Sequence, residues 1–213
     1  MAIDRKAQLA ENLAAVKASI PNDVHLIVVT KTFPLSDAQL LHDLGVLEFG
    51  ENRDQEGKEK APFVPGKWHF QGQLQSNKLK SITTWADVIQ TIDSLRYVAL
   101  VSKASEKNLE VFIQVSLDGE VHRGGALPEQ LNQIADSILA TSNLKLQGLM
   151  AVAPLGEQPD SAFERLAKIH QNFVTAYPAA PYLSSGMSGD YLSAINHGAT
   201  HIRLGSSILG SRT

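Results

Sequence analysis

The chain of 213 residues contains no cysteine, and this absence removes several kinds of chemistry at once. Disulfide bonds, thiolate nucleophiles and cysteine-ligated metal centres are all excluded. The chain also lacks any run of basic residues, and its 19 basic and 22 acidic side chains leave a formal charge of −3. This balance provides no electrostatic surface for nucleic acid or for an anionic membrane, so neither is expected as a partner.

Long hydrophobic runs are missing as well. No apolar stretch approaches the length of about 18 residues that spans a bilayer. The N-terminal residues 1–6 lead into a charged helix rather than into the apolar core of a signal peptide. Internal repeats, low-complexity tracts and linkers are also absent from the sequence. We therefore expect a soluble, cytoplasmic protein that folds as one domain over residues 1–213.

What the sequence does contain is a regular alternation of apolar segments and amphipathic helical patterns. A helical pattern over residues 3–19 comes first. Ser36 is expected to cap the next helix, and Gly50 to end the second strand. The predicted strands are 24–30, 46–49, 68–70, 88–92, 109–117, 144–152, 181–184 and 200–204. The predicted helices that follow them are 36–44, 52–60, 76–83, 94–106, 127–141, 160–176, 189–197 and a short one from about Ser206.

This alternation predicts a parallel sheet, because each crossover helix returns the chain to the same edge. Eight such units close most readily into a (β/α)8 TIM barrel of the α/β class. The pattern over residues 3–19 is then an extra N-terminal helix. An open, doubly wound sheet stays as the structural alternative.

A lysine closes the first predicted strand. Residues 24–30 are mostly β-branched or aliphatic, which is typical of a buried strand, and Lys31 follows them before a turn at Pro34. A lysine in this position either extends its ammonium to solvent or points into a site. In a site, burial would lower its pKa and make the amine a nucleophile for Schiff-base chemistry. The position alone leaves both interpretations open.

Glycine and serine gather at the ends of the last two predicted strands, which in a barrel share one mouth with Lys31. Gly205 allows the backbone to approach an anion closely, and Ser206 lies at a helix start where free N–H groups attract phosphate. Ser188 offers a hydroxyl from the neighbouring loop. Taken singly, each could be an ordinary turn glycine or helix cap. Together they predict a phosphate site opposite a lysine, which suits pyridoxal 5′-phosphate (PLP) or the phosphorylated sugar of a lysine aldolase.

Arg203 bears on the choice between these ligands. It could pair with a carboxylate inside the barrel. If it instead faces the pyridine nitrogen of PLP, its fixed positive charge keeps that nitrogen unprotonated and weakens the ring as an electron sink. Such a site would hold PLP while restricting carbanion chemistry.

Six motifs occur in an order that resembles the pyridoxal phosphate homeostasis proteins, the YggS-type family. The resemblance runs from about residue 24 to the C-terminus and implies a single barrel similar to the N-terminal domain of alanine racemase. The motifs are Val28–Thr32, Phe49–Asn52, Trp68–Phe70 with Leu74–Lys78, Gly148–Ala151, Gly186–Ser188 and Arg203–Ser206.

The resemblance implies a role for individual residues. By this likeness Lys31 carries PLP as a Schiff base, Asn52 lies beside the ring and Arg203 faces the pyridine nitrogen. The phosphate would be held by Ser188, Gly205 and Ser206. The family implies a role in vitamin B6 homeostasis without established turnover, with apo PLP-dependent enzymes as recipients of the cofactor. No catalytic residue and no metal ligand is expected.

The sequence departs from the family in a few places. Phe33 stands where many members have a second lysine, so the sequence does not show whether PLP can pass between neighbouring lysines here. Gln71 and Gln73 replace an apolar residue and a proline around Gly72. None of these positions is among the proposed PLP contacts.

Two enzymatic alternatives stay open. A PLP-dependent amino-acid racemase needs a second acid or base on the opposite face of the ring, which alanine racemases take from a second domain and a partner subunit. The chain ends nine residues after Leu204, so we expect that domain to be absent and favour a monomer. A lysine aldolase would need an acid or base near the lysine, and Glu51 is the obvious candidate.

Two further features are expected to be structural. His69 lies within a predicted strand before its end, which favours a core histidine with satisfied hydrogen bonds. The charged run 53–60 is interpreted as a solvated helix face with ion pairs between residues four apart.

Overall fold

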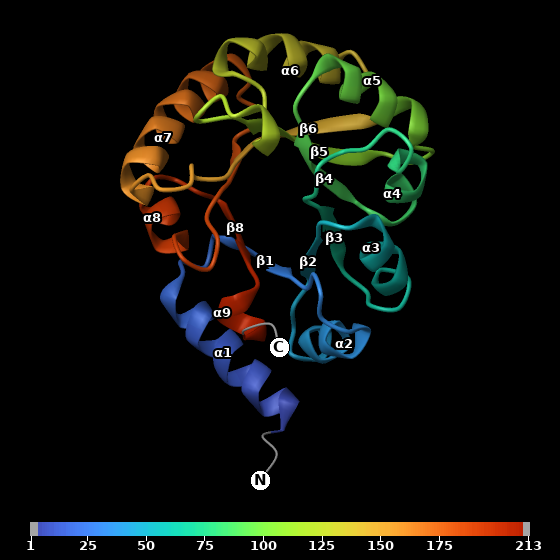
Figure 1. Ribbon diagram of the computed structural model, residues 1–213, viewed down its shortest axis with the longest axis vertical. Coiled ribbons are helices and arrows are strands. Elements are labelled where there is room, and N and C mark those ends of the chain that lie inside the picture. Colours follow the sequence, from blue (N-terminus) through green and yellow to red (C-terminus); the bar gives the residue numbers. More distant parts are fainter. Residues whose placement is uncertain (1–3, 211–213) are drawn as a thin grey trace.

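The computed structural model describes residues 4–210, which form a closed barrel of eight parallel strands surrounded by helices (Figure 1). The predicted TIM barrel is confirmed. The open sheet is wrong, because the first and last strands pair over four backbone positions and close the ring. The strands are β1 His25–Val29, β2 Glu48–Glu51, β3 Lys67–Phe70, β4 Val88–Ile92, β5 Leu109–Val115, β6 Leu144–Ala151, β7 Tyr182–Ser184 and β8 His201–Leu204.

Helices form the outer ring, and the expected N-terminal helix, α1, lies outside it against α9 and α2 (Figure 1). Two short 3₁₀-helices, η1 Val121–Arg123 and η2 Pro128–Gln130, separate β5 from α6. Within residues 4–210, no helix is both long enough and apolar enough to cross a membrane. The helices are α1 Arg5–Ser19, α2 Leu35–Asp43, α3 Asp54–Lys60, α4 Leu79–Trp85, α5 Leu95–Ala104, α6 Leu131–Leu139, α7 Pro159–Ala176, α8 Tyr191–Asn196 and α9 Ser206–Leu209.

Ser36 and Gly50 do not mark the ends of elements as predicted. Ser36 does not cap α2, because the helix begins one residue earlier and Pro34, with an extended backbone, occupies the N-cap position. Gly50 does not end β2, because the strand continues to Glu51 and pairs with β3 along its whole length. The glycine has a packing role instead: a Cβ at Gly50 would lie 2.8 Å from the side-chain nitrogen of Gln71.

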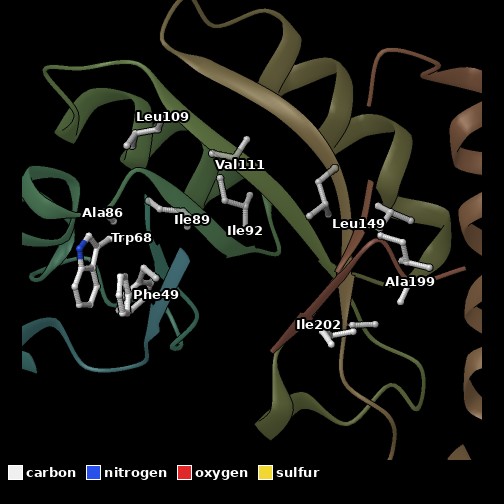
Figure 2. Packing of buried hydrophobic residues seen from close by; sticks show 14 of the residues in the cluster. Phe49, Trp68, Ala86, Ile89, Ile92, Leu109, Val111, Leu149, Ala199 and Ile202 are labelled. Atoms are coloured by element: carbon white, nitrogen blue, oxygen red, sulfur yellow. The ribbon is translucent and has the colours of Figure 1, made fainter. Parts of the chain in front are cut away.

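The main hydrophobic core lies between the strands and the helices that cover them (Figure 2). Phe49 of β2 stacks on Trp68 of β3 with ring centroids 4.9 Å apart, and both rings are buried. The indole Nε1 of Trp68 donates to the carbonyl of Val64 at 3.0 Å, so its polar atom is satisfied. Because side chains alternate between the two faces of a strand, His69 points to the opposite face, toward the inside of the barrel.

A buried ion pair supports the carboxyl end of β1. Lys60 of α3 is 4 % exposed, and its Nζ lies 2.7 Å from Oε1 of Glu51. The same ammonium donates to the carbonyl of Thr30 at 2.8 Å, and the Thr30 hydroxyl donates to Glu51 at 2.5 Å. The expected solvated face is therefore wrong for Lys60. The helical pattern of the charged run did not reveal that α3 would place this lysine over the ends of two strands.

We expect Lys60→Met to lower the free energy of unfolding by about 3–5 kcal/mol, because Glu51 would stay buried without its cation. The double variant Glu51→Gln/Lys60→Met should recover much of this loss, since both charges are then gone. Urea denaturation compares these variants with Lys58→Met, which alters an exposed lysine of the same helix. Equal losses for Lys60→Met and Lys58→Met would contradict a stabilising role for the pair.

Candidate functional site

A cavity of about 420 Å³ opens at the carboxyl ends of the strands. All six residues that the sequence analysis assigned to a cofactor contribute to its wall. They are Lys31, Asn52, Ser188, Arg203, Gly205 and Ser206. The rest of the wall is largely apolar or glycine and comprises Val29, Phe33, Gln71, Met150, Val152, Met187, Gly189 and Gly210.

Lys31 reaches this cavity from the end of β1. It comes two residues after Val29, and its side chain is partly buried and contributes to the cavity wall. The side chain of Lys31 therefore does not extend only into bulk solvent. Phe33 lines the same cavity, so the wall next to Lys31 is apolar at this position.

The backbone next to Lys31 is held in an unfavourable conformation. Thr32 has a φ of 69°, a left-handed value that is costly for a β-branched residue. Its N–H donates to Oε2 of Glu56 at 2.5 Å, and this carboxylate lies 3.5 Å from the ammonium of Lys60. The ion pair under β1 therefore also stabilises the turn that fixes the position of Lys31.

Arg203 is buried in β8, with 5 % of its surface exposed. Its Nη1 donates to the hydroxyl of Ser184 at 2.8 Å, and its Nη2 donates to the carbonyl of Ala151 at 2.9 Å. No carboxylate within residues 4–210 forms an ion pair with it, so the alternative of a paired arginine is wrong. Burial lowers the pKa of Arg203 to about 10, although Asp190 opposes the shift. The guanidinium therefore stays protonated at neutral pH and places a positive charge beside the cavity.

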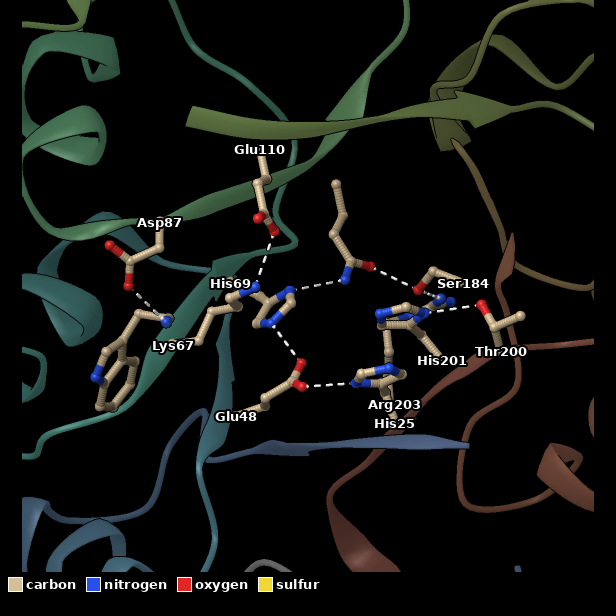
Figure 3. A network of polar contacts seen from close by, with 12 residues as sticks. His25, Glu48, Lys67, His69, Asp87, Glu110, Ser184, Thr200, His201 and Arg203 are labelled. Atoms are coloured by element: carbon tan, nitrogen blue, oxygen red, sulfur yellow. Dashed lines mark hydrogen bonds and ion pairs between the residues drawn. The ribbon is translucent and has the colours of Figure 1, made fainter. Parts of the chain in front are cut away.

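A chain of hydrogen bonds leads from Arg203 through the inside of the barrel (Figure 3). Ser184 donates to Oε1 of Gln90 at 2.8 Å, and Nε2 of Gln90 lies 3.0 Å from Nδ1 of His69. Because an amide nitrogen can only donate, Nδ1 of His69 accepts, and its Nε2–H donates to Glu48 at 3.0 Å. Burial lowers the pKa of His69 although Glu48 opposes the shift, which agrees with a neutral ring. The expected core histidine with satisfied hydrogen bonds is confirmed.

Small residues form the wall next to β8. A Cβ at Gly205 would lie 3.2 Å from the carbonyl oxygen of Val29, so a larger residue would crowd the end of β1. The N–H of Ser207 donates to the hydroxyl of Ser188 at 3.2 Å and ties the loops after β7 and β8 together. That contact leaves the hydroxyl hydrogen of Ser188 available to donate. Ser206 is exposed at the first position of α9.

Gln71 is a cavity residue that the sequence analysis did not assign to the site. Its Nε2 is buried, and no described residue accepts a hydrogen bond from it. A buried amide without a partner costs about 1–3 kcal/mol, so the position favours a bound polar group. The signal was the replacement of an apolar residue by glutamine next to Gly72.

Glu51 does not contribute to the cavity wall, although it ends β2. Its carboxylate is fully buried against Lys60 and Thr30. Burial raises the pKa of Glu51, although Lys60 opposes the shift. Among the described residues that line the cavity, Lys31 and Arg203 are the ones with titratable side chains. Glu51 is therefore not placed to serve as the acid or base that a lysine aldolase needs.

The chain is similar to known proteins in both sequence and fold. Residues 3–213 match the family described as the N-terminal domain of alanine racemase. A pyridoxal phosphate homeostasis protein of Corynebacterium glutamicum is 40 % identical over 200 residues, which cover 89 % of this chain and 90 % of that protein. PipY of Synechococcus elongatus, whose structure was solved with PLP bound, is 28 % identical with a TM-score of 0.87. That match covers 95 % of this chain and 100 % of PipY.

An alanine racemase of Clostridium difficile has the same fold, with a TM-score of 0.82 at 14 % identity. The match covers 97 % of this chain but 57 % of the racemase. At this level of identity the likeness establishes the barrel and says nothing about the reaction.

Proposed function

Because this chain belongs to the pyridoxal phosphate homeostasis proteins, within the alanine racemase N-terminal domain family, we propose that it binds PLP in intracellular vitamin B6 homeostasis. The convergence of Lys31 and Arg203 on one cavity with three small phosphate-binding candidates carries this proposal. In our proposal residues 1–213 form one cytoplasmic PLP-binding domain that acts as a monomer. The recipients of its cofactor are apo PLP-dependent enzymes.

The chemistry of the cavity wall suits each functional group of PLP. The amine of Lys31 is the group that condenses with an aldehyde carbon, with formation of the C=N bond of a Schiff base and release of water. Arg203 serves the pyridine nitrogen, because a protonated guanidinium disfavours a second proton there. Asn52 lies beside the ring and supplies an amide.

In our proposal, hydrogen-bond donors of the cavity wall bind the phosphate and the remaining polar atoms of PLP. Ser188 and Ser206 provide hydroxyls, and Gly205 lets the backbone approach an anion closely. Gln71 adds an amide N–H that lacks a partner among the described residues. When bound, PLP would supply an electron sink. The positive charge of Arg203 would weaken this sink, because it disfavours protonation of the pyridine nitrogen.

We propose further that the protein holds PLP without turning over a substrate. Stereoinversion requires proton transfer at both faces of the cofactor ring, which takes two titratable groups. Among the described cavity residues, Lys31 and Arg203 are the ones with titratable side chains, and Arg203, with a pKa of about 10, stays protonated at neutral pH and cannot act as the second base. A racemase-like enzyme is the alternative, and the match of residues 3–213 to the alanine racemase N-terminal domain family is the observation that favours it.

Lys31→Ala should abolish the visible absorbance of the PLP Schiff base, because the variant has no amine at that position of the cavity. Absorbance spectra of the purified proteins measure this, and Lys58→Ala, which alters an exposed lysine, serves as the matched control. Borohydride reduction followed by peptide mass mapping should place a pyridoxyl group on Lys31 in the wild type. A pyridoxyl group on another lysine would contradict the assignment of the Schiff base to Lys31.

We expect the PLP-loaded wild type to racemise neither alanine nor other amino acids at a measurable rate, because a second proton-transfer group is missing from the described cavity wall. Chiral chromatography after prolonged incubation measures the outcome. Racemisation that disappears in Lys31→Ala and persists in Lys58→Ala would overturn the storage role while leaving PLP binding intact.

Gln71→Leu should change two properties in opposite directions. The free energy of unfolding of the PLP-free protein should stay equal or rise, because a buried amide without a partner is removed. PLP affinity should fall roughly two- to tenfold, the effect of one hydrogen bond of about 0.5–1.5 kcal/mol. Urea denaturation and PLP titration of Gln71→Leu and of exposed Gln73→Leu test this pair of effects. Unchanged affinity in both variants would exclude Gln71 from the binding site.

A further inference from the structure

A second cluster of chemically active side chains lies at the opposite end of the barrel, where the strands begin. His25, Glu48 and His201 are the first residues of β1, β2 and β8. One potential ligand atom from each of the three lies within 4.8 Å of the others. The rings of His25 and His201 are stacked, with centroids 4.3 Å apart, and Nδ1 of His25 lies 2.9 Å from Oε1 of Glu48 (Figure 3).

We propose that His25, Glu48 and His201 form a binding site for a divalent transition-metal ion of the Zn²⁺ class. Two imidazoles and one carboxylate are a ligand set that Zn²⁺ and its neighbours in the first transition row prefer, whereas Mg²⁺ and Ca²⁺ favour oxygen ligands. Three protein ligands leave a coordination position for water. This site differs from the sequence expectation of no metal ligand, and it does not depend on the proposed function in PLP binding.

The buried ligand His201 is oriented by its neighbours. It is 7 % exposed, and its Nδ1 lies 2.8 Å from the hydroxyl of Thr200. The Thr200 hydroxyl also lies within donating distance of the Leu183 carbonyl, at 3.2 Å. Thr200 can therefore accept from Nδ1–H of His201, which leaves the lone pair on Nε2 for a metal ion.

Glu48 is held in place in a similar way. Its Oε2 accepts from Nε2–H of His69 at 3.0 Å, so its Oε1 is the oxygen that faces His25. A hydrogen bond to the second carboxylate oxygen is the kind of outer contact that orients metal ligands. His69 is in turn fixed by Gln90, which belongs to the chain that ends at Arg203.

His25 is the ligand that can move. Its side chain is 46 % exposed, while that of Glu48 is 19 % exposed. A tetrahedral ion with ligand bonds of about 2.0–2.1 Å requires donor atoms about 3.3 Å apart. The spread of up to 4.8 Å, together with the stacked rings, therefore implies that His25 turns toward the ion while the other two ligands keep their places.

The neighbouring lysine does not neutralise the carboxylate of Glu48, which stays available to a cation. Lys67, the nearby cation, pairs with Glu110 at 2.9 Å rather than with Glu48. The ring of Tyr182 lies edge-on to both imidazoles, and that of Phe112 lies edge-on to His201. These rings form an apolar rim on one side, and the exposed edge of His25 gives access from solvent.

Calorimetric titration of the untagged, full-length protein with ZnCl₂ tests the proposal. We expect saturable binding of one ion per chain, with affinity at least about tenfold weaker in His25→Gln. His25→Gln alters a half-exposed side chain and should leave the fold intact, which circular dichroism checks. His122→Gln, on an exposed residue of η1, is the control and should bind like the wild type.

Titration with Co²⁺ adds a second measurement, because its visible absorption reports the number and geometry of the ligands. The wild type should give bands of a four- or five-coordinate ion that are lost in His25→Gln and in Glu48→Gln. Absence of saturable Zn²⁺ binding would overturn the site and leave the cluster as a polar seal of the barrel. Equal binding by the wild type and His25→Gln would also overturn it, because the ion would then bind elsewhere, for example at the Lys31 cavity.

Discussion

The pairing of β1 with β8 is the constraint on which both ends of this barrel depend. In this register Ile27 lies opposite Arg203, and Val28 lies opposite Leu204. The end of β1, which carries Lys31, therefore lies next to the loop that begins at Gly205. In an open sheet of the same strand order, the first and last strands would be about 34 Å apart, because neighbouring strands are about 4.8 Å apart. Without closure, the lysine and the arginine could not line one cavity.

Polar side chains occupy part of the inside of this barrel, where many barrels are filled with branched apolar side chains. Arg203 projects inward without a described carboxylate partner, and it is held by neutral dipoles from Ser184 and Ala151. A carboxylate there would cancel the charge, whereas neutral acceptors satisfy the donors and keep the charge at the cavity. Gln90 and His69 continue the chain because every buried polar group along it needs a partner.

Features with a local or periodic origin could be predicted from the sequence. Lys31 and Arg203 lie at ends of apolar segments, and a barrel brings such ends together whatever the details of packing. Contacts between distant segments could not be predicted. Lys60 looked like part of a solvated face, because nothing in its own helix reveals Glu51 beneath it. The stacking of His25 on His201 depends on the register of the first and last strands, which exists only after closure.

The backbone next to Lys31 is held more tightly than a surface lysine would require. The unfavourable φ of Thr32 costs about 1–3 kcal/mol, which must be offset by neighbouring interactions. The offset comes from Glu56 and from the buried Lys60, which together hold the turn. A fixed backbone next to Lys31 suits the proposed link to an aldehyde, because it lowers the entropic cost of bringing the amine to the reacting carbon. Fixing this turn does not supply a second proton-transfer group, which agrees with our proposal that the protein holds a cofactor without turning over a substrate.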